Sequence, residues 1–421
     1  MNKTITIDDI DTLLLNHDDE IYTAIRMGLE IDSTKYLEVV KDEYKLNDRS
    51  ISLSNSQTYF LENYIREYLK IKTQLYQQRF HRIASEIPSI LEKLKTLELP
   101  EQRSPEWYEM RNHILTASSL ADALGKGHFK TQLDLMIAKT STEEAPFISN
   151  NIIEWGVKYE PIATSFYEKM NHLKIVEFGL VPHPKLTIFG ASPDGICDLD
   201  SPTDYVGRML EIKCPPIRKF TKEVPYHYWI QMQGQLETCD LEECDFLQVK
   251  LFEYDSDDRY NEDISYNEDE TVKKGYTSNH LPKGSLVTIT SLDEKGATKY
   301  MYEYGEFYLS YEEHLTWFQT IQAKYQDEKY TVEQIWWRID RYECTLVGRD
   351  RQWWNSIVPD ILDFWENVEH YRMVGNQELV DKKNKRKRKK KPTVKKNIIT
   401  INAEIESQIQ TKCFLDSDDE P

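Results

Sequence analysis

The order of apolar and polar residues predicts alternating strands and helices in the middle of the chain. Two apolar runs, at 187–192 and 205–212, are each followed by a segment typical of strand ends, so we expect two adjacent strands that form a hairpin. Apolar residues at helical spacing over 153–167 and 226–237 predict one helix before this hairpin and one after it. The pattern favours an α/β (α+β) core with a central mixed sheet flanked by helices.

The flanking regions differ from this core and suggest four parts. Apolar spacing before residue 99 is helical, strand-like runs recur at 246–254, 285–290 and 298–304, and a helix is expected at 356–371. We therefore predict an N-terminal helical accessory domain at 1–98, a core domain at 99–255, a strand-containing extension with a closing helix at 256–372, and a disordered basic then acidic tail at 373–421.

Candidate chemistry is concentrated at the ends of the two central strands. Asp194 lies in a Ser-Pro-Asp-Gly turn, and Glu211 and Lys213 follow as Glu-Ile-Lys. Residues two apart on a strand point to the same face, so Glu211 and Lys213 should line one pocket. Mg²⁺ takes oxygen ligands and is usually held by one or two carboxylates together with substrate phosphate. These residues therefore predict a metal-dependent phosphodiesterase site.

Glutamine side chains on the following helix are further candidates. Gln231 and Gln235 are four residues apart and share a helix face. A glutamine amide can contact a metal-bound water or a phosphate. The ordinary alternative is a polar helix face, just as Glu160 on the preceding helix is by default a solvated carboxylate.

Six motifs in order make the chain resemble the lambda-type exonuclease and YqaJ-type viral recombinase family of the PD-(D/E)xK nuclease superfamily. They are, in chain order, 102–111, 114–118, Trp155-Gly156 with Tyr159-Glu160, 192–195, 211–215 and 228–233. The resemblance covers about 150 residues. It implies a restriction-endonuclease-like core and a deoxyribonuclease that hydrolyses phosphodiester bonds with Mg²⁺ or Mn²⁺.

The resemblance also implies a role for each matching residue. The implied metal ligands are Glu160, Asp194, Glu211 and the carbonyl of Ile212, and the implied catalytic residues are Lys213, Glu211, Asp194 and Gln231. Arg111 and Ser118 match residues that grip the 5′-phosphate of a DNA end in this family. The alternatives are a salt-bridged surface arginine for Arg111 and a helix N-cap for Ser118.

The sequence departs from the family in two respects. One enzyme branch carries an additional acidic residue about ten positions before the Pro-Asp-Gly turn, and residues 181–185 contain none, which argues against a second metal site of that kind. A related branch of RecB-like nucleases holds an iron–sulfur cluster with four cysteines. The six cysteines of this chain include no Cys-x-x-Cys pair, so we expect no iron–sulfur cluster and no zinc site.

The charge of the chain is unusual for a DNA-binding protein. The net charge is −19, yet residues 382–396 contain eleven basic residues and no acidic one. The remainder is therefore strongly acidic and would repel DNA at long range. DNA must be met by a local basic groove, by bound metal or by this basic segment, which is also a candidate nuclear-import signal. With no run of about 18 apolar residues, no membrane span is expected.

The leading interpretation is an exonuclease that degrades the 5′-phosphorylated strand of linear double-stranded DNA for recombination, repair or genome processing. The alternatives are a structure-specific or single-strand endonuclease and a non-catalytic DNA-end-binding protein on the same fold. The family implies a homo-oligomer, either a dimer or a ring-shaped trimer. Candidate protein partners are a single-strand annealing protein or a helicase. We expect an intracellular protein, cytoplasmic or nuclear, with a composition compatible with a large DNA virus.

Overall fold

The computed structural model describes residues 6–390, except 45, 47–52, 101, 103, 142–150, 204, 218, 219, 294 and 295, and the side chains of 151 and 386–390. The basic and acidic residues from 391 onward, part of the predicted tail, lie outside the described residues.

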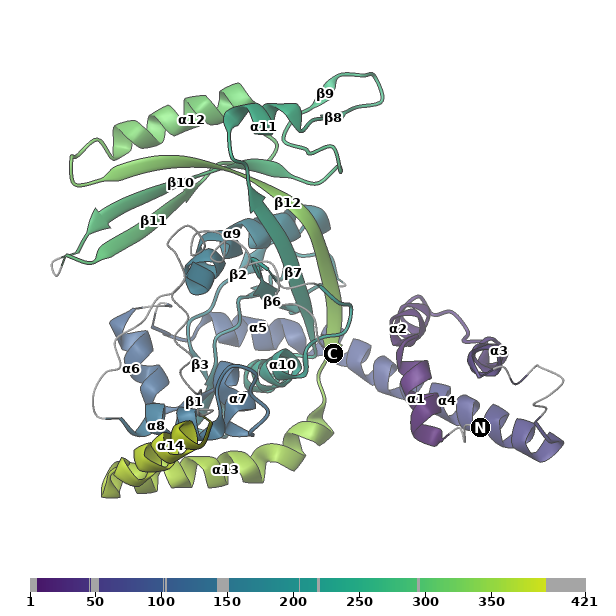
Figure 1. The fold of residues 1–421 in the computed structure, drawn as a ribbon. Helices are drawn as coiled ribbons and strands as arrows, with labels where there is room; N and C mark the ends of the chain where they lie inside the picture. The colour runs from purple at the N-terminus through teal and green to yellow at the C-terminus, as the bar shows by residue number, and fades with distance from the viewer. Residues whose placement is uncertain are drawn as a thin grey trace, which may run out of the picture.

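A seven-stranded mixed sheet runs through the protein (Figure 1). In spatial order its strands are β11 (Thr298–Tyr304), β10 (Lys283–Leu292), β12 (Thr331–Gly348), β7 (Glu243–Glu253), β6 (Met209–Lys213), β5 (Gly195–Cys197) and β2 (Ile175–Val176). β6 and β7 are parallel, and the other neighbouring strands are antiparallel. The predicted mixed α/β architecture is confirmed, and the strands expected at 285–290 and 298–304 belong to this same sheet.

The predicted hairpin was wrong in one of its strands. The run at 187–192 forms β4 (Phe189–Ala191), which pairs with β1 (Leu115–Thr116) and β3 (Val181–Pro182) in a separate small sheet. β6 pairs instead with β5, which starts at Gly195 directly after Asp194. The Pro-Asp-Gly segment therefore joins two sheets, and it leads the chain into the strand beside Glu211.

Helices cover both faces of the large sheet near β6. Alternate residues of β6 face opposite sides, so Leu210 and Ile212 pack in the cluster that includes α9 (Asn151–Asn171), whereas Met209 packs with α10 (Tyr226–Cys239). Glu211 has the parity of Met209 and faces α10. α10 also lies close to α7 (Ala117–Ala123), because Gly234 has no side chain there; a Cβ would lie 3.2 Å from side-chain atoms of Ala117 and Leu120.

The remaining core helices pack around α10. α8 (Gln132–Thr140) and α13 (Arg351–Val374) share a buried cluster with α7, and α6 (Pro105–His113) precedes β1. The extension at 256–372 holds α11 (Asp257–Glu262) and α12 (Tyr311–Lys324) beside β8 (Ser265–Tyr266) and β9 (Val272–Lys273). Residues 256–275 thus contain a short helix and a small hairpin. The described helices include none with the length and apolar character needed to cross a membrane.

The chain also remains helical beyond residue 373, where we expected disorder. α14 (Gln377–Lys390) packs against α8, with Leu379 buried and an ion pair of 2.6 Å between Lys383 and Asp134. This segment is helical because lysine and arginine have high helix propensity. The buried Leu379 and the ion pair of Lys383 attach it to α8.

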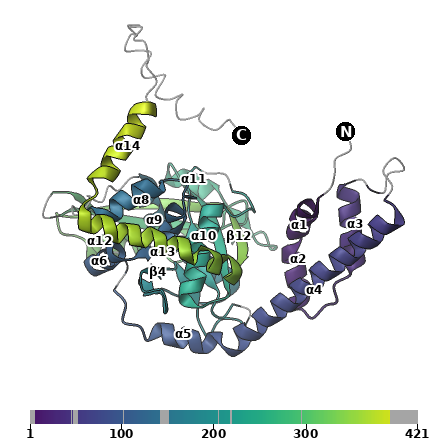
Figure 2. The same cartoon turned by 90° about the horizontal axis from the view of Figure 1, so that it is seen from below.

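The N-terminal region is helical, as its spacing predicts. It contains α1 (Ile7–Leu15), α2 (Asp18–Arg26), α3 (Ser33–Glu43), α4 (Asn55–Ser85) and α5 (Ile87–Lys95). Figure 2 shows α1–α3 gathered along α4, to one side of the sheet. By contrast, Ile87, Leu91 and Leu94 of α5 pack in the cluster with β6 and α10. The domain boundary at residue 98 stays a prediction.

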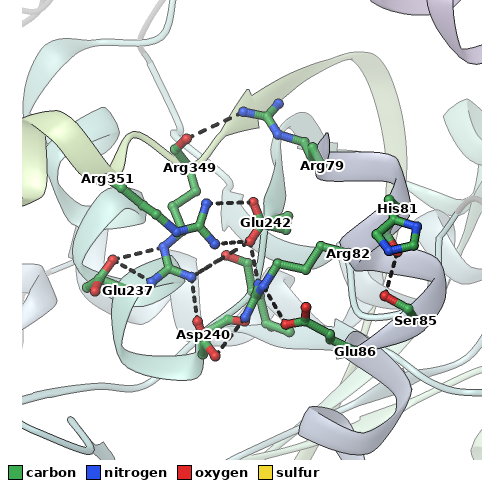
Figure 3. Close-up of polar contacts among 11 residues, drawn as sticks. Arg79, His81, Arg82, Ser85, Glu86, Glu237, Asp240, Glu242, Arg349 and Arg351 are labelled. Atoms are coloured by element: carbon green, nitrogen blue, oxygen red, sulfur yellow. Dashed lines mark hydrogen bonds and ion pairs between the residues drawn. The ribbon is translucent and has the colours of Figure 1, made fainter. Parts of the chain in front are cut away.

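A network of charged side chains joins the end of α4 to this core (Figure 3). Glu242, only 3% exposed, is paired with Arg82 of α4 and with Arg351, and Arg349 lies 3.8 Å from it. Arg349 also pairs with Glu237 at 2.6 Å and with Asp240 at 2.7 Å. The network therefore connects α4, the C-terminal end of α10 and the segment between β12 and α13.

Candidate active site

Glu211 is the centre of the candidate active site. Its side chain is completely buried on β6 and faces α10. Oε1 pairs with the Lys213 ammonium and accepts a hydrogen bond of 2.7 Å from the Gln231 amide, while Oε2 accepts one of 2.7 Å from the Gln235 amide. The structure thus brings together Glu211, Lys213 and Gln231, as their positions in the sequence predicted.

Gln235 is the glutamine candidate to which the resemblance assigned no role. It is 1% exposed, and its amide also lies 3.4 Å from the carbonyl oxygen of Ser192. The available signal was its four-residue spacing from Gln231, which places both amides on one helix face. That spacing also fits an ordinary polar face, and only the packing of α10 against β6 shows that both amides reach one carboxylate.

Asp194 lies next to this group, immediately before β5. Its Oδ2 accepts a hydrogen bond of 2.7 Å from the backbone N–H of Ile212, which fixes the carboxylate against β6. Burial, and then the neighbouring Glu211 carboxylate, hold the pKa of Asp194 well above its usual range, and Glu160 on α9 adds to this shift. The pKa of Asp194 is therefore raised by two other carboxylates, those of Glu211 and Glu160.

Lys213 counters this negative charge. Burial alone would lower the pKa of Lys213, but the Glu211 and Asp194 carboxylates outweigh that effect and raise it above its ordinary value. The ammonium lies 5.1 Å from the ring centre of Tyr228. Lys213 is therefore a cation at neutral pH. It cannot accept a proton from water there, but it can orient a water or stabilise developing negative charge.

Arg111 and Ser118 form a second polar group. The Arg111 guanidinium donates a hydrogen bond of 3.1 Å to the Ser118 hydroxyl and lies 4.3 Å from the ring centre of Trp107. The Trp107 indole N–H in turn donates to the Ser192 hydroxyl at 3.2 Å, two residues before Asp194. The N-cap of α7 is Thr116, so the hydroxyl of Ser118 contacts Arg111 and is not the cap of this helix.

Lys139 supports the backbone that carries Arg111. Its ammonium donates to the carbonyl oxygen of Arg111 and, at 2.8 Å, to that of Ile114. Burial lowers the pKa of Lys139 to about 7, and the nearby Arg111 and Arg372 guanidiniums contribute to this lowering. Arg372 of α13 donates at 2.9 Å to the carbonyl oxygen of Lys139 and at 2.6 Å to that of Asn112. Two cations thus hold the end of α6.

The carboxylates must also be compared with what a divalent cation needs. Among the described residues, no three His, Cys, Asp or Glu side chains form a ready-made metal-binding group. Mg²⁺ requires fewer protein ligands, because one or two carboxylates with waters and substrate oxygens complete its shell. The donor set fits this requirement: the electrostatically coupled carboxylates are hard oxygen donors, and their repulsion, seen in the raised pKa of Asp194, would be relieved by a cation.

Comparisons with known proteins show what the chain is similar to. Residues 106–242, which include Asp194, Glu211, Lys213 and both glutamines, match the model of the YqaJ-like viral recombinase domain. An uncharacterized protein of Acanthamoeba polyphaga mimivirus is 30% identical over 307 residues, which are 67% of this chain and 55% of that protein. The chain therefore spans about half the length of this relative.

Two solved structures show limited likeness to the chain. The alkaline exonuclease LHK-Exo of Laribacter hongkongensis is 19% identical and has a TM-score of 0.37, with 66% of this chain and 99% of that chain covered. A phage-related exonuclease of Haemophilus somnus is 11% identical and has a TM-score of 0.30, with 63% and 96% covered. The family model, and not these structures, carries the likeness: residues 106–242 of this chain are similar to the YqaJ-like viral recombinase domain.

Proposed function

We propose that the chain is a metal-dependent DNA nuclease that degrades linear double-stranded DNA from its ends in the 5′-to-3′ direction. The observation that carries this proposal is the buried Glu211 carboxylate, held by Lys213 and two glutamines beside Asp194. A buried carboxylate must be paired and hydrogen-bonded, and a buried carboxylate beside a second one with a raised pKa is typical of a functional site. The match to a viral recombinase domain over the same residues supports a role in DNA processing.

The residues that would hold the metal are Asp194 and Glu211, with Glu160 and the Ile212 carbonyl as further ligands. We propose Mg²⁺ or Mn²⁺. When bound, such an ion polarises the scissile phosphate and lowers the pKa of a coordinated water. Glu211 enters this arrangement already oriented, because Gln231 and Gln235 each hold one of its oxygens.

The protein's own groups would then position the reactants. The Lys213 ammonium is held by Glu211, so it can donate to the attacking water or to a phosphate oxygen that gains charge during in-line attack. Gln231 contacts the same carboxylate oxygen as Lys213, so it limits where that ammonium can lie. Neither residue needs to lose a proton for this role.

The Arg111–Ser118 pair would select the end of the DNA. A guanidinium and a hydroxyl 3.1 Å apart suit a terminal 5′-phosphate, which accepts several charge-assisted hydrogen bonds. Trp107 contacts Arg111 on one side and Ser192, near Asp194, on the other. It would therefore fix the distance between the bound 5′-phosphate and the cleavage site. Recombination, repair or genome processing are the roles that such an end resection serves. A dimer or trimer stays a prediction.

Removal of either charge tests the proposal. Asp194→Asn and Lys213→Met should each abolish cleavage of 5′-phosphorylated linear duplex while the circular dichroism spectrum stays unchanged. Calorimetry with Mg²⁺ should show binding to the wild type and weakened binding to Asp194→Asn. Full activity in both variants would overturn the assignment, and metal or DNA binding without cleavage by the wild type would favour a non-catalytic DNA-end-binding protein.

A further inference from the structure

An apolar cleft of about 750 Å³ opens beside the candidate active site. Glu160, Ile212 and Lys213 form part of its wall, and the N-terminal halves of α9 and α10 form much of the rest. A volume of this size fits a small-molecule ligand or one to two nucleotides, and it is too small for a double helix. A DNA strand that reached Lys213 and Glu160 through this cleft would therefore enter it unpaired.

Three rings stand together on one side of the cleft. The imidazoles of His128 and His227 are stacked, with ring centres 5.1 Å apart and planes 12° apart. The Phe129 ring meets both edge-on, at 4.6 Å and 6.0 Å. We call His128, Phe129 and His227 the aromatic platform.

The exposure of Phe129 points to a ligand. Its side chain is 79% exposed, although burial of a phenylalanine is worth about 1.5–3 kcal/mol. It lines the cleft together with the exposed apolar residues Ile152 and Ile217. A contiguous apolar patch at the edge of a polar site is typical of a binding surface.

The charge next to the platform indicates which ligand. Lys126 and Lys130 flank His128 and Phe129 in the sequence, and both are exposed. The chain as a whole is acidic, with a net charge of −19, but these two cations place positive charge beside the platform. Exposed rings between lysines are the combination that binds single-stranded nucleic acid, because bases stack on the rings and phosphates pair with the cations. An apolar peptide would not require the lysines.

We propose that the aromatic platform stacks an unpaired nucleobase of the strand that enters the cleft, next to the phosphate that is cut. This proposal rests on the proposed function and adds to it a base-binding subsite. Stacking is tolerant of sequence, because every base has an aromatic face. The subsite would therefore hold the strand in place without selecting a sequence.

Fluorescence of 2-aminopurine tests this subsite without cleavage. The probe is a 5′-phosphorylated duplex whose first two nucleotides are unpaired, with 2-aminopurine at the second, bound in EDTA. The wild type should quench the fluorescence, and Phe129→Ala should lose the quenching and bind about 10-fold more weakly. Phe129→Trp should behave as the wild type does. Tyr266→Ala, which removes a ring that is 56% exposed on β8, is the matched control and should have no effect.

A second probe separates stacking from other effects. With an abasic nucleotide at the reporter position, the wild type and Phe129→Ala should bind equally. Equal quenching by both proteins, or a loss of affinity that is independent of the base, would overturn the subsite while leaving the nuclease proposal intact. A wild type that binds neither probe would overturn both, and binding of an apolar peptide in place of DNA would assign the cleft to a protein partner.

Discussion

The side-chain amide of Gln235 lies 2.7 Å from Oε2 of Glu211, inside the protein and one helical turn from Gln231, whose amide lies 2.7 Å from Oε1. Both oxygens of one buried carboxylate are thus held by a single face of α10. Such contacts fix the direction in which a carboxylate presents its remaining lone pairs, and this direction decides whether it can bind a metal.

Gln235→Met should therefore impair the site without removing any proposed ligand. We expect a 10–100-fold loss of activity or of metal affinity, the usual effect of removing a residue that orients a ligand. Initial rates across a Mg²⁺ titration would measure it. Gln233→Met is the matched control, because Gln233 is equally buried on α10 but donates to the carbonyl oxygen of Gly348 at 3.0 Å. A similar shift in Mg²⁺ dependence for both variants would contradict the role of Gln235.

Arg111→Ala should weaken recognition of the DNA end. A hydrogen bond to a charged group contributes about 1.5–3 kcal/mol, so cleavage of 5′-phosphorylated ends should fall about 10- to 100-fold. Ends with a 5′-hydroxyl lack the phosphate, and their slower cleavage should change little. The comparison of both substrates in one time course checks this. An equal loss on both would mean that Arg111 acts on the fold and not on the phosphate.

Lys139 should make the stability of the protein depend on pH. Its pKa is lowered to about 7 in the folded protein, from an ordinary value of 10.5, so the unfolded chain binds more protons between these values. The free energy of unfolding of the wild type, relative to Lys139→Met, should therefore increase as the pH rises from about 7 toward 10, and stay constant below about 6. Urea denaturation at several pH values measures this difference. A difference independent of pH would contradict the lowered pKa.

Glu242 should contribute strongly to stability. It is almost completely buried among Arg82, Arg349 and Arg351, so Glu242→Ala would remove a carboxylate that lies within ion-pair distance of all three cations (Figure 3). The loss of one member of a buried ion pair costs about 3–5 kcal/mol. Glu86 is another partner of Arg82, but the Glu86 side chain is 58% exposed. Glu86→Ala should therefore lower the free energy of unfolding by less than about 1 kcal/mol. Equal effects in denaturant titrations would show that the network does not depend on burial.

The sequence predicted which residues gather at the candidate site better than it predicted the strands around them. Asp194, Glu211 and Lys213 were identified from local spacing, which the backbone of β6 and its neighbour preserves. The strand that pairs with β6 was not identified. The run at 187–192 has a strand-like pattern, but in the structure it forms β4 of a separate small sheet. Local pattern does not determine which strands pair.

Long-range contacts also explain the other differences. The helix at 377–390 looked like part of a disordered polycation, and its contacts with α8 come from residues more than two hundred positions away. Gln235 and Lys139 likewise acquire their roles from contacts with other elements of the fold, Gln235 with Glu211 on β6 and Lys139 with the carbonyl oxygen of Arg111 in α6. Such residues carry no motif of their own.

Cleavage of two DNA forms by the wild type and by Glu211→Gln tests the central claim most directly. The substrates are a 5′-phosphorylated linear duplex and a covalently closed circle, with Mg²⁺ or Mn²⁺ and with EDTA. The proposal predicts metal-dependent loss of the linear duplex alone by the wild type, and no loss with Glu211→Gln. Cutting of the circle would assign an endonuclease, and unchanged activity in Glu211→Gln would contradict the proposed active site.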